Sequence, residues 1–133
     1  MSDLVLLIDD DPRLVAVLQI RLEASGYLVH AAHGGEEGLS AAKRLRPRVI
    51  VLDVNMPGMD GLEVCRLVRA DGELCATPII VMSAVTHEAA RQAATTAGAS
   101  QFLGKPYQPA QVLAVIRAAV ESQRASASNT TAA

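Results

Sequence analysis

Four apolar runs of the sequence are each followed by side chains that can do ionic or hydrogen-bonding chemistry. Asp9 and Asp10 follow LVLLI (4–8), Asp53 follows RVIVL (48–52), Ser83 follows PIIVM (78–82), and Lys105 follows SQFL (100–103). Carboxylate oxygens suit a hard divalent ion, and Mg²⁺ typically takes one or two carboxylates and shares a phosphate oxygen. A lysine supplies a positive charge for an anion, and a serine supplies a hydroxyl donor. Brought together, these groups form a phosphoryl-transfer site in which an aspartate can be the nucleophile.

A parallel sheet would bring these side chains to one rim. The predicted strands are residues 4–8, 27–31, 48–52, 78–82 and 100–103. They alternate with predicted helices near 12–25, 35–45, 61–70, 86–97 and 108–123. This alternation predicts an α/β fold, a doubly wound, five-stranded parallel sheet with helices on both faces. Ligands bind such a sheet at the carboxyl ends of its strands, where the acids, the serine and the lysine stand.

The composition of the runs predicts their place in the sheet. Residues 4–8, 49–52 and 79–82 are apolar throughout, as expected of central strands buried on both faces. Residues 27–31 and 100–103 are more mixed and are expected at the edges.

The acidic triplet Asp9–Asp11 divides between two roles. Asp11 precedes Pro12, a pattern typical of a helix N-cap followed by proline at the first helical position. Asp60 is expected in a turn or at the start of the third helix. Asp9 and Asp10 therefore remain for the site.

The composition of the chain argues against several classes of function. A chain of 133 residues is most simply one domain. Its net charge of −2 gives no basic footprint for nucleic acid, and three aromatic residues are too few for base stacking. Two cysteines are expected to be reduced thiols. The sequence shows no signal peptide and no membrane-spanning run, so we expect a cytoplasmic protein without direct nucleic-acid or membrane contacts.

The set Asp9–Asp10, Asp53, Ser83 and Lys105–Pro106 resembles the receiver domain of bacterial two-component response regulators. The loop DVNMPGMDG (53–61) is also typical of that family. The resemblance covers residues 4–122 and implies a flavodoxin-like sheet in the order 2-1-3-4-5. We expect a receiver domain over 1–122, with 123–133 a disordered tail or the start of a linker.

The resemblance also implies roles for individual residues. Asp53 would accept a phosphoryl group from a phosphohistidine on a sensor histidine kinase or a histidine phosphotransfer protein. Asp10 would bind Mg²⁺ directly, Asp9 mainly through water, and the main-chain carbonyl of Asn55 would complete the protein ligands. Asn55 would also tune the lifetime of the phosphate, together with Val85.

Three further positions are implied to respond to the phosphate. Lys105 would pair with the phosphoryl oxygens, and its bond to Pro106 would be cis. Ser83 would swing toward the phosphate, and Phe102 would rotate inward to fill the vacated space. The result would be a changed surface for a downstream protein target or output domain, with phosphorylation-dependent dimerisation as one outcome. Such a chain would phosphorylate and dephosphorylate itself without being an enzyme.

Other functions remain as alternatives. A Mg²⁺-dependent phosphatase with an aspartyl nucleophile would carry a second acid two residues after it, where this sequence has Asn55, and would need a cap domain. An adaptor with a decayed site is a third class, although every switch position is filled. Ala16, Val17 and Ile20 form either a docking patch for the phosphodonor or ordinary scattered surface residues. A stand-alone regulator and a piece of a larger protein both fit the sequence.

Overall fold

The computed structural model describes residues 3–56 and 58–132, and for 126–132 only the course of the backbone. Four residues lie outside the described ones. Residues 1 and 2 begin the predicted domain, residue 57 belongs to its DVNMPGMDG loop, and residue 133 ends the predicted tail. Strands and helices alternate along the chain: β1 (Leu4–Ile8), α1 (Pro12–Ala24), β2 (Leu28–Ala32), α2 (Gly35–Leu45), β3 (Val49–Asp53), α3 (Gly61–Ala70), β4 (Ile79–Ser83), α4 (Glu88–Ala97), β5 (Gln101–Gly104) and α5 (Pro109–Ala132).

The five strands form one parallel sheet in the order β2-β1-β3-β4-β5, which confirms the predicted fold class. β3 and β4 are buried at every position, whereas β2 and β5 are partly exposed, as expected of edges. From β2 onward each strand lies one residue later than predicted at both ends. Asp53 and Ser83 are therefore still paired with neighbouring strands, to Met82 and Gly104.

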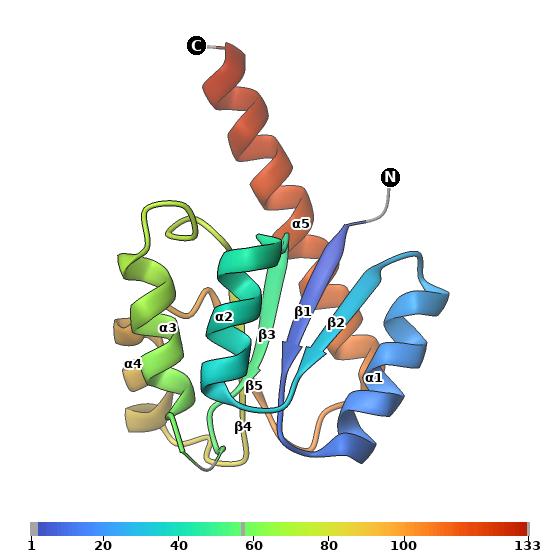
Figure 1. Cartoon of the computed structure of the whole chain (residues 1–133), viewed down its shortest axis with the longest axis vertical. Coiled ribbons are helices and arrows are strands. Elements are labelled where there is room, and N and C mark those ends of the chain that lie inside the picture. The colour runs from blue at the N-terminus through green and yellow to red at the C-terminus, as the bar shows by residue number, and fades with distance from the viewer. Residues whose placement is uncertain (1–2, 57, 133) are drawn as a thin grey trace.

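Helices cover both faces of the sheet (Figure 1). An apolar core fills the space between the sheet and the helices on each face. Side chains alternate between the faces of a strand, so Leu6 and Ile8 pack under α2, α3 and α4. Val5 and Leu7 pack on the opposite face, under α1 and α5. Every strand is thus fixed in register by both faces, which in turn fixes the residues at its carboxyl end.

Local signals set the helix ends near the site. The Asp11 side chain accepts hydrogen bonds from the amides of Arg13 and Leu14, so the predicted N-cap is confirmed. Asp60 caps α3 by accepting from the amide of Leu62. α4 begins two residues later than predicted because the His87 imidazole caps it.

α5 is longer than the predicted helix. The helix was expected to end near residue 123, but it runs to Ala132. The division into a receiver domain over 1–122 and a tail or linker start over 123–133 stays a prediction. Neither glycine nor proline follows Pro109, and alanine favours helix, so no local signal ends it. Figure 1 shows α5 continuing beyond the body of the domain.

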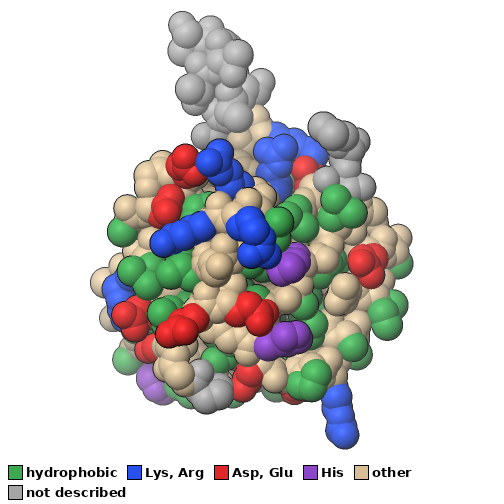
Figure 2. Space-filling model, in the orientation of Figure 1, with side chains coloured by type: hydrophobic (Ala, Val, Ile, Leu, Met, Phe, Trp, Pro, Cys, Tyr) green, Lys and Arg blue, Asp and Glu red, His purple; other side chains and the backbone are tan. Residues whose placement is uncertain are grey.

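Ion pairs lie at the end of the sheet opposite the acidic rim, where β1 begins and α5 continues beyond the domain (Figure 1). Asp3 accepts from Arg48 at 3.2 Å and from Arg124 at 2.5 Å, which ties the start of β1 to α5. Arg46 lies 2.5 Å from Glu73. Figure 2 shows basic side chains gathered near this edge, with acidic ones across the middle of the face. Among the described residues, no helix has the length and apolar character that a membrane crossing needs.

One arginine ties the C-terminal end of α4 to its surroundings. Arg69, in the last turn of α3, donates to the carbonyl oxygens of Gly98 at 2.9 Å and Thr77 at 2.6 Å. It also donates to the Cys75 carbonyl at 3.2 Å and the Ser100 hydroxyl at 3.3 Å. Gly98 caps α4 in the left-handed conformation, at φ 111°. This end of α4 is therefore held to α3, to the loop before β4 and to the start of β5.

Candidate functional site

Three carboxylates meet where β1 and β3 end. Asp9 and Asp10 come directly after β1, and Asp53 is the last residue of β3, its immediate neighbour. One oxygen from each lies within 4.8 Å of one from each of the others. Asp9 and Asp53 are buried, whereas Asp10 is exposed. The structure thus brings together the three acids that the sequence placed on one rim.

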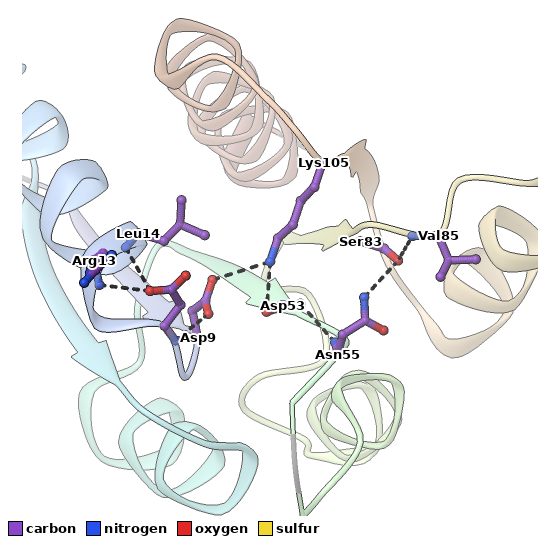
Figure 3. Close-up of polar contacts among 9 residues, drawn as sticks. Asp9, Arg13, Leu14, Asp53, Asn55, Ser83, Val85 and Lys105 are labelled. Carbon is purple, nitrogen blue, oxygen red and sulfur yellow. Dashed lines mark hydrogen bonds and ion pairs between the residues drawn. The ribbon is translucent and has the colours of Figure 1, made fainter.

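Lys105 reaches into this acidic group from the loop after β5 (Figure 3). Its Nζ donates to Asp53 Oδ2 at 3.0 Å and lies 4.0 Å from Asp9 Oδ2. The Lys105–Pro106 peptide bond is cis. A cation therefore stands between two buried carboxylates.

Backbone amides hold the other oxygen of each buried acid. The amide of Asn55 donates to Asp53 Oδ1, and the amide of Asp11 donates to Asp9 Oδ1, both at 2.9 Å. Gly61 lets α3 begin directly against the end of β3, because a Cβ there would lie 2.6 Å from the Val54 Cα. The orientation of Asp53 is therefore fixed by the chain around it.

Asp9 is the carboxylate of the group whose charge is least well compensated. Its Oδ2 is buried and has no hydrogen-bond partner among the described residues. Burial raises the pKa of Asp9 to about 6, and the charge of Asp53 adds to the rise. The Asp11 amide and Lys105 act in the opposite direction. A buried carboxylate oxygen without a hydrogen-bond partner is costly, and a divalent cation close to this oxygen would lower the cost. The three acids therefore fit a hard, oxygen-liganded metal ion.

The β4 side of the rim is neutral. The Ser83 hydroxyl is buried and accepts from the Val85 amide at 3.0 Å and the Asn55 Nδ2 at 3.5 Å. Figure 3 shows Ser83 linked to the acidic group only through Asn55. A hydroxyl and an amide thus stand beside the charged centre and can form hydrogen bonds with a new anion.

Next to Ser83 lies a cavity of about 210 Å³. Val81, Ser83 and the half-buried ring of Phe102 line it from the sheet, and Ala90, Ala93 and Ala94 from α4. The cavity leaves unfilled space beside the ring and the first turns of α4.

Sequence reasoning missed Tyr107, which follows Lys105 by two residues. Its hydroxyl oxygen is buried and unpaired within the part of the chain that the structure describes. Burial raises the pKa of Tyr107 above its ordinary value, and the charges of Asp9, Asp53 and Asp11 contribute. The hydroxyl therefore faces a negative field. Only its position beside the lysine in the sequence hinted at this placement.

Comparisons with known proteins agree with the geometry. A family model described as the response regulator receiver domain matches residues 5–117. "DNA-binding response regulator MtrA" of Mycolicibacterium smegmatis is 35% identical over 89% of this chain and 50% of the relative. "Response regulator MprA" of Mycobacterium ulcerans is 42% identical over the same shares. The chain thus spans about half the length of these relatives.

Solved structures give the same result. The chemotaxis response regulator CheY4 of Vibrio cholerae superimposes with a TM-score of 0.85 at 32% identity, covering 90% of this chain and 99% of that one. The receiver domain of sensor histidine kinase PA1611 from Pseudomonas aeruginosa gives a TM-score of 0.84 at 26% identity, covering 91% and 99%. Its title describes a magnesium ion coordinated in the active-site cleft.

Proposed function

The chain belongs to the response regulator receiver domain family, a family of phosphorelay signalling domains, and we propose that Asp53 is its phosphoryl acceptor. The observation that carries the proposal is the pairing of a buried, backbone-oriented Asp53 with Lys105 at 3.0 Å. The partner would be a phosphohistidine on a sensor histidine kinase or a histidine phosphotransfer protein. The downstream target or output domain is part of the same proposal.

The transfer follows from the groups in place. A carboxylate oxygen of Asp53 attacks the phosphorus, and the bond from phosphorus to the histidine nitrogen breaks. The Asn55 amide keeps the carboxylate oriented, and Lys105 neutralises charge on the phosphoryl oxygens. Mg²⁺, held by Asp9, Asp10, Asp53 and the carbonyl of Asn55, would supply charge neutralisation and phosphate binding.

The switch would begin at Ser83. A phosphoryl group on Asp53 adds a charge of about −1.5 to −2 and three strong acceptors. The Ser83 hydroxyl, now bonded to Asn55 and the Val85 amide, would move to donate to the new oxygens. Phe102 would then move into the space beside it.

An intact-mass measurement tests the proposal. The chain is incubated with acetyl phosphate and Mg²⁺, and wild type is compared with Asp53→Ala. Asp60→Ala is a matched control, because Asp60 lies in the loop that follows Asp53 but caps α3. Wild type and Asp60→Ala should gain the mass of one phosphoryl group, and Asp53→Ala should gain none. No gain in wild type would overturn the proposal.

Three further expectations remain proposals. The name of the MtrA relative describes DNA binding, and the match covers 50% of that protein. The expected lack of direct nucleic-acid contact is therefore proposed only for the receiver domain, where Arg46 and Arg48 already pair with acids. We also propose a cytoplasmic location and a cycle of self-phosphorylation and self-dephosphorylation. The phosphatase alternative is not favoured by these matches.

A further inference from the structure

Arg91 of α4 lies over the aromatic ring of Phe102. Its guanidinium carbon is 4.8 Å from the centre of the ring, within the range of a cation–π contact. Both partners are accessible to solvent, Arg91 exposed and Phe102 half-buried. Since Phe102 is the one phenylalanine of the chain, this contact concerns a single ring.

The same arginine also holds the loop between β4 and α4. Its Nε donates to the carbonyl oxygen of Thr86 at 3.2 Å. Thr86 in turn packs on β5, because a Cβ at Gly104 would lie 2.7 Å from the Thr86 Cγ2. Arg91 therefore contacts both the ring on β5 and the loop that leads away from Ser83.

The cavity lies against this ring. Phe102 forms part of its lining, together with the small side chains of Ala90, Ala93 and Ala94. A ring that turned into the cavity would change the face it offers to Arg91, so the turn must break the contact at 4.8 Å.

We propose that Arg91 is a positioning residue that latches Phe102 and the β4–α4 loop in the unphosphorylated arrangement. The inference rests on the proposed function of Asp53 and adds to it a residue that sets how readily the switch turns. An exposed cation–π contact is weak, so the latch biases the equilibrium and does not lock it. Its loss should raise the population of the turned ring about two- to fivefold.

The single phenylalanine gives a direct probe. Incorporation of 4-fluorophenylalanine labels Phe102 alone, and its ¹⁹F spectrum reports the environments of the ring. Wild type is compared with Arg91→Met, Arg91→Lys and Arg44→Met, first without a phosphodonor. Arg44→Met is the matched control, because it removes an exposed positive charge from α2.

The expected result is a shift of the ¹⁹F signal in Arg91→Met toward the position that wild type reaches with acetyl phosphate and Mg²⁺. Arg91→Lys, which keeps the charge, should lie between, and Arg44→Met should match wild type. Equal spectra for Arg91→Met and wild type without a phosphodonor would overturn the latch. Intact mass, recorded on the same samples, shows separately whether Asp53 takes up phosphate, so a failure of the proposed function is distinguishable from a failure of the latch.

Discussion

The rim of the sheet has two halves that differ in how tightly they are held. At the ends of β1 and β3, two buried carboxylates are each fixed by a backbone amide and share one lysine. On β4 and β5, Ser83 and Phe102 border a cavity and make only neutral hydrogen bonds, apolar packing and an exposed cation–π contact. The first half is charged and held by backbone amides, and the second is neutral and borders unfilled space.

This difference separates chemistry from signalling. Phosphoryl transfer, as proposed for Asp53, needs groups that do not reorganise during the reaction, and carboxylates held by backbone amides suit that need. A switch needs two states of similar free energy, which weak contacts beside a cavity allow. α4 shows the contrast within one helix. Its C-terminal end is bonded at the Gly98 carbonyl by Arg69, which also bonds Cys75, Thr77 and Ser100, whereas its N-terminal end borders the cavity.

The charged half should be the more sensitive to mutation. Lys105→Met removes the cation 3.0 Å from Asp53, leaving Asp9 and Asp53 to repel each other. We expect the rate of phosphoryl uptake from acetyl phosphate to fall about a hundredfold or more. The rate is followed by intact mass. A rate within a few fold of wild type would show that the charge of Lys105 does not drive the reaction.

The anchored end of α4 should matter for stability but not for chemistry. Arg69→Met removes four hydrogen bonds, and we expect the free energy of unfolding to fall by about 2–3 kcal/mol. Urea denaturation measures the change, with the exposed neighbour Arg66→Met as the control. Unaltered stability would mean that water replaces these contacts without cost.

The raised pKa of Asp9 predicts an unusual pH dependence. Without divalent cations, the folded chain binds a proton more tightly at Asp9 than the unfolded chain, with a pKa of about 6 against 3.8. The contribution of Asp9 to the free energy of unfolding therefore falls as the pH rises from about 4 to 6, by about 1–2 kcal/mol.

Mg²⁺ and a neutral side chain should both remove this effect. Mg²⁺ should raise the melting temperature more above pH 6 than near pH 4, because it competes with the proton. Asp9→Asn should flatten the pH dependence and weaken the response to Mg²⁺. Thermal melts across this range check both results, and identical pH profiles for wild type and Asp9→Asn would contradict the assignment.

The smallest effect is expected at the neutral half. Ser83→Ala removes one hydroxyl, and we expect uptake to slow about two- to tenfold, the worth of one ordinary hydrogen bond. Ser83→Thr keeps the hydroxyl and should stay near wild type. A loss as large as that of Lys105→Met would show that both halves take equal part in the chemistry.

The sequence predicted the elements and the acidic rim because these depend on local patterns. Uniformly apolar runs identify the buried strands, and Asp11 before Pro12 identifies a helix start. Neither pattern requires knowledge of which distant residues come into contact. The shift of four strands by one residue was missed because pairing with neighbours, not composition, decides where a strand ends.

Contacts between distant side chains could not be predicted. The sequence gives no sign of the contacts of Arg69 and Arg91, because these depend on packing that brings Gly98 and Phe102 beside them. The buried hydroxyl of Tyr107 depends in the same way on what surrounds it. The extension of α5 was missed because small polar residues were taken to favour disorder, although nothing there stops a helix.

Locating the phosphoryl group tests the central claim most directly. After incubation with acetyl phosphate and Mg²⁺, borohydride converts an aspartyl phosphate to homoserine and leaves free carboxylates unchanged. Peptide mass spectrometry then finds the converted residue. Homoserine at position 53 alone is the expected result. Conversion at Asp9 or Asp10, or phosphate on another residue with none at Asp53, would contradict the account.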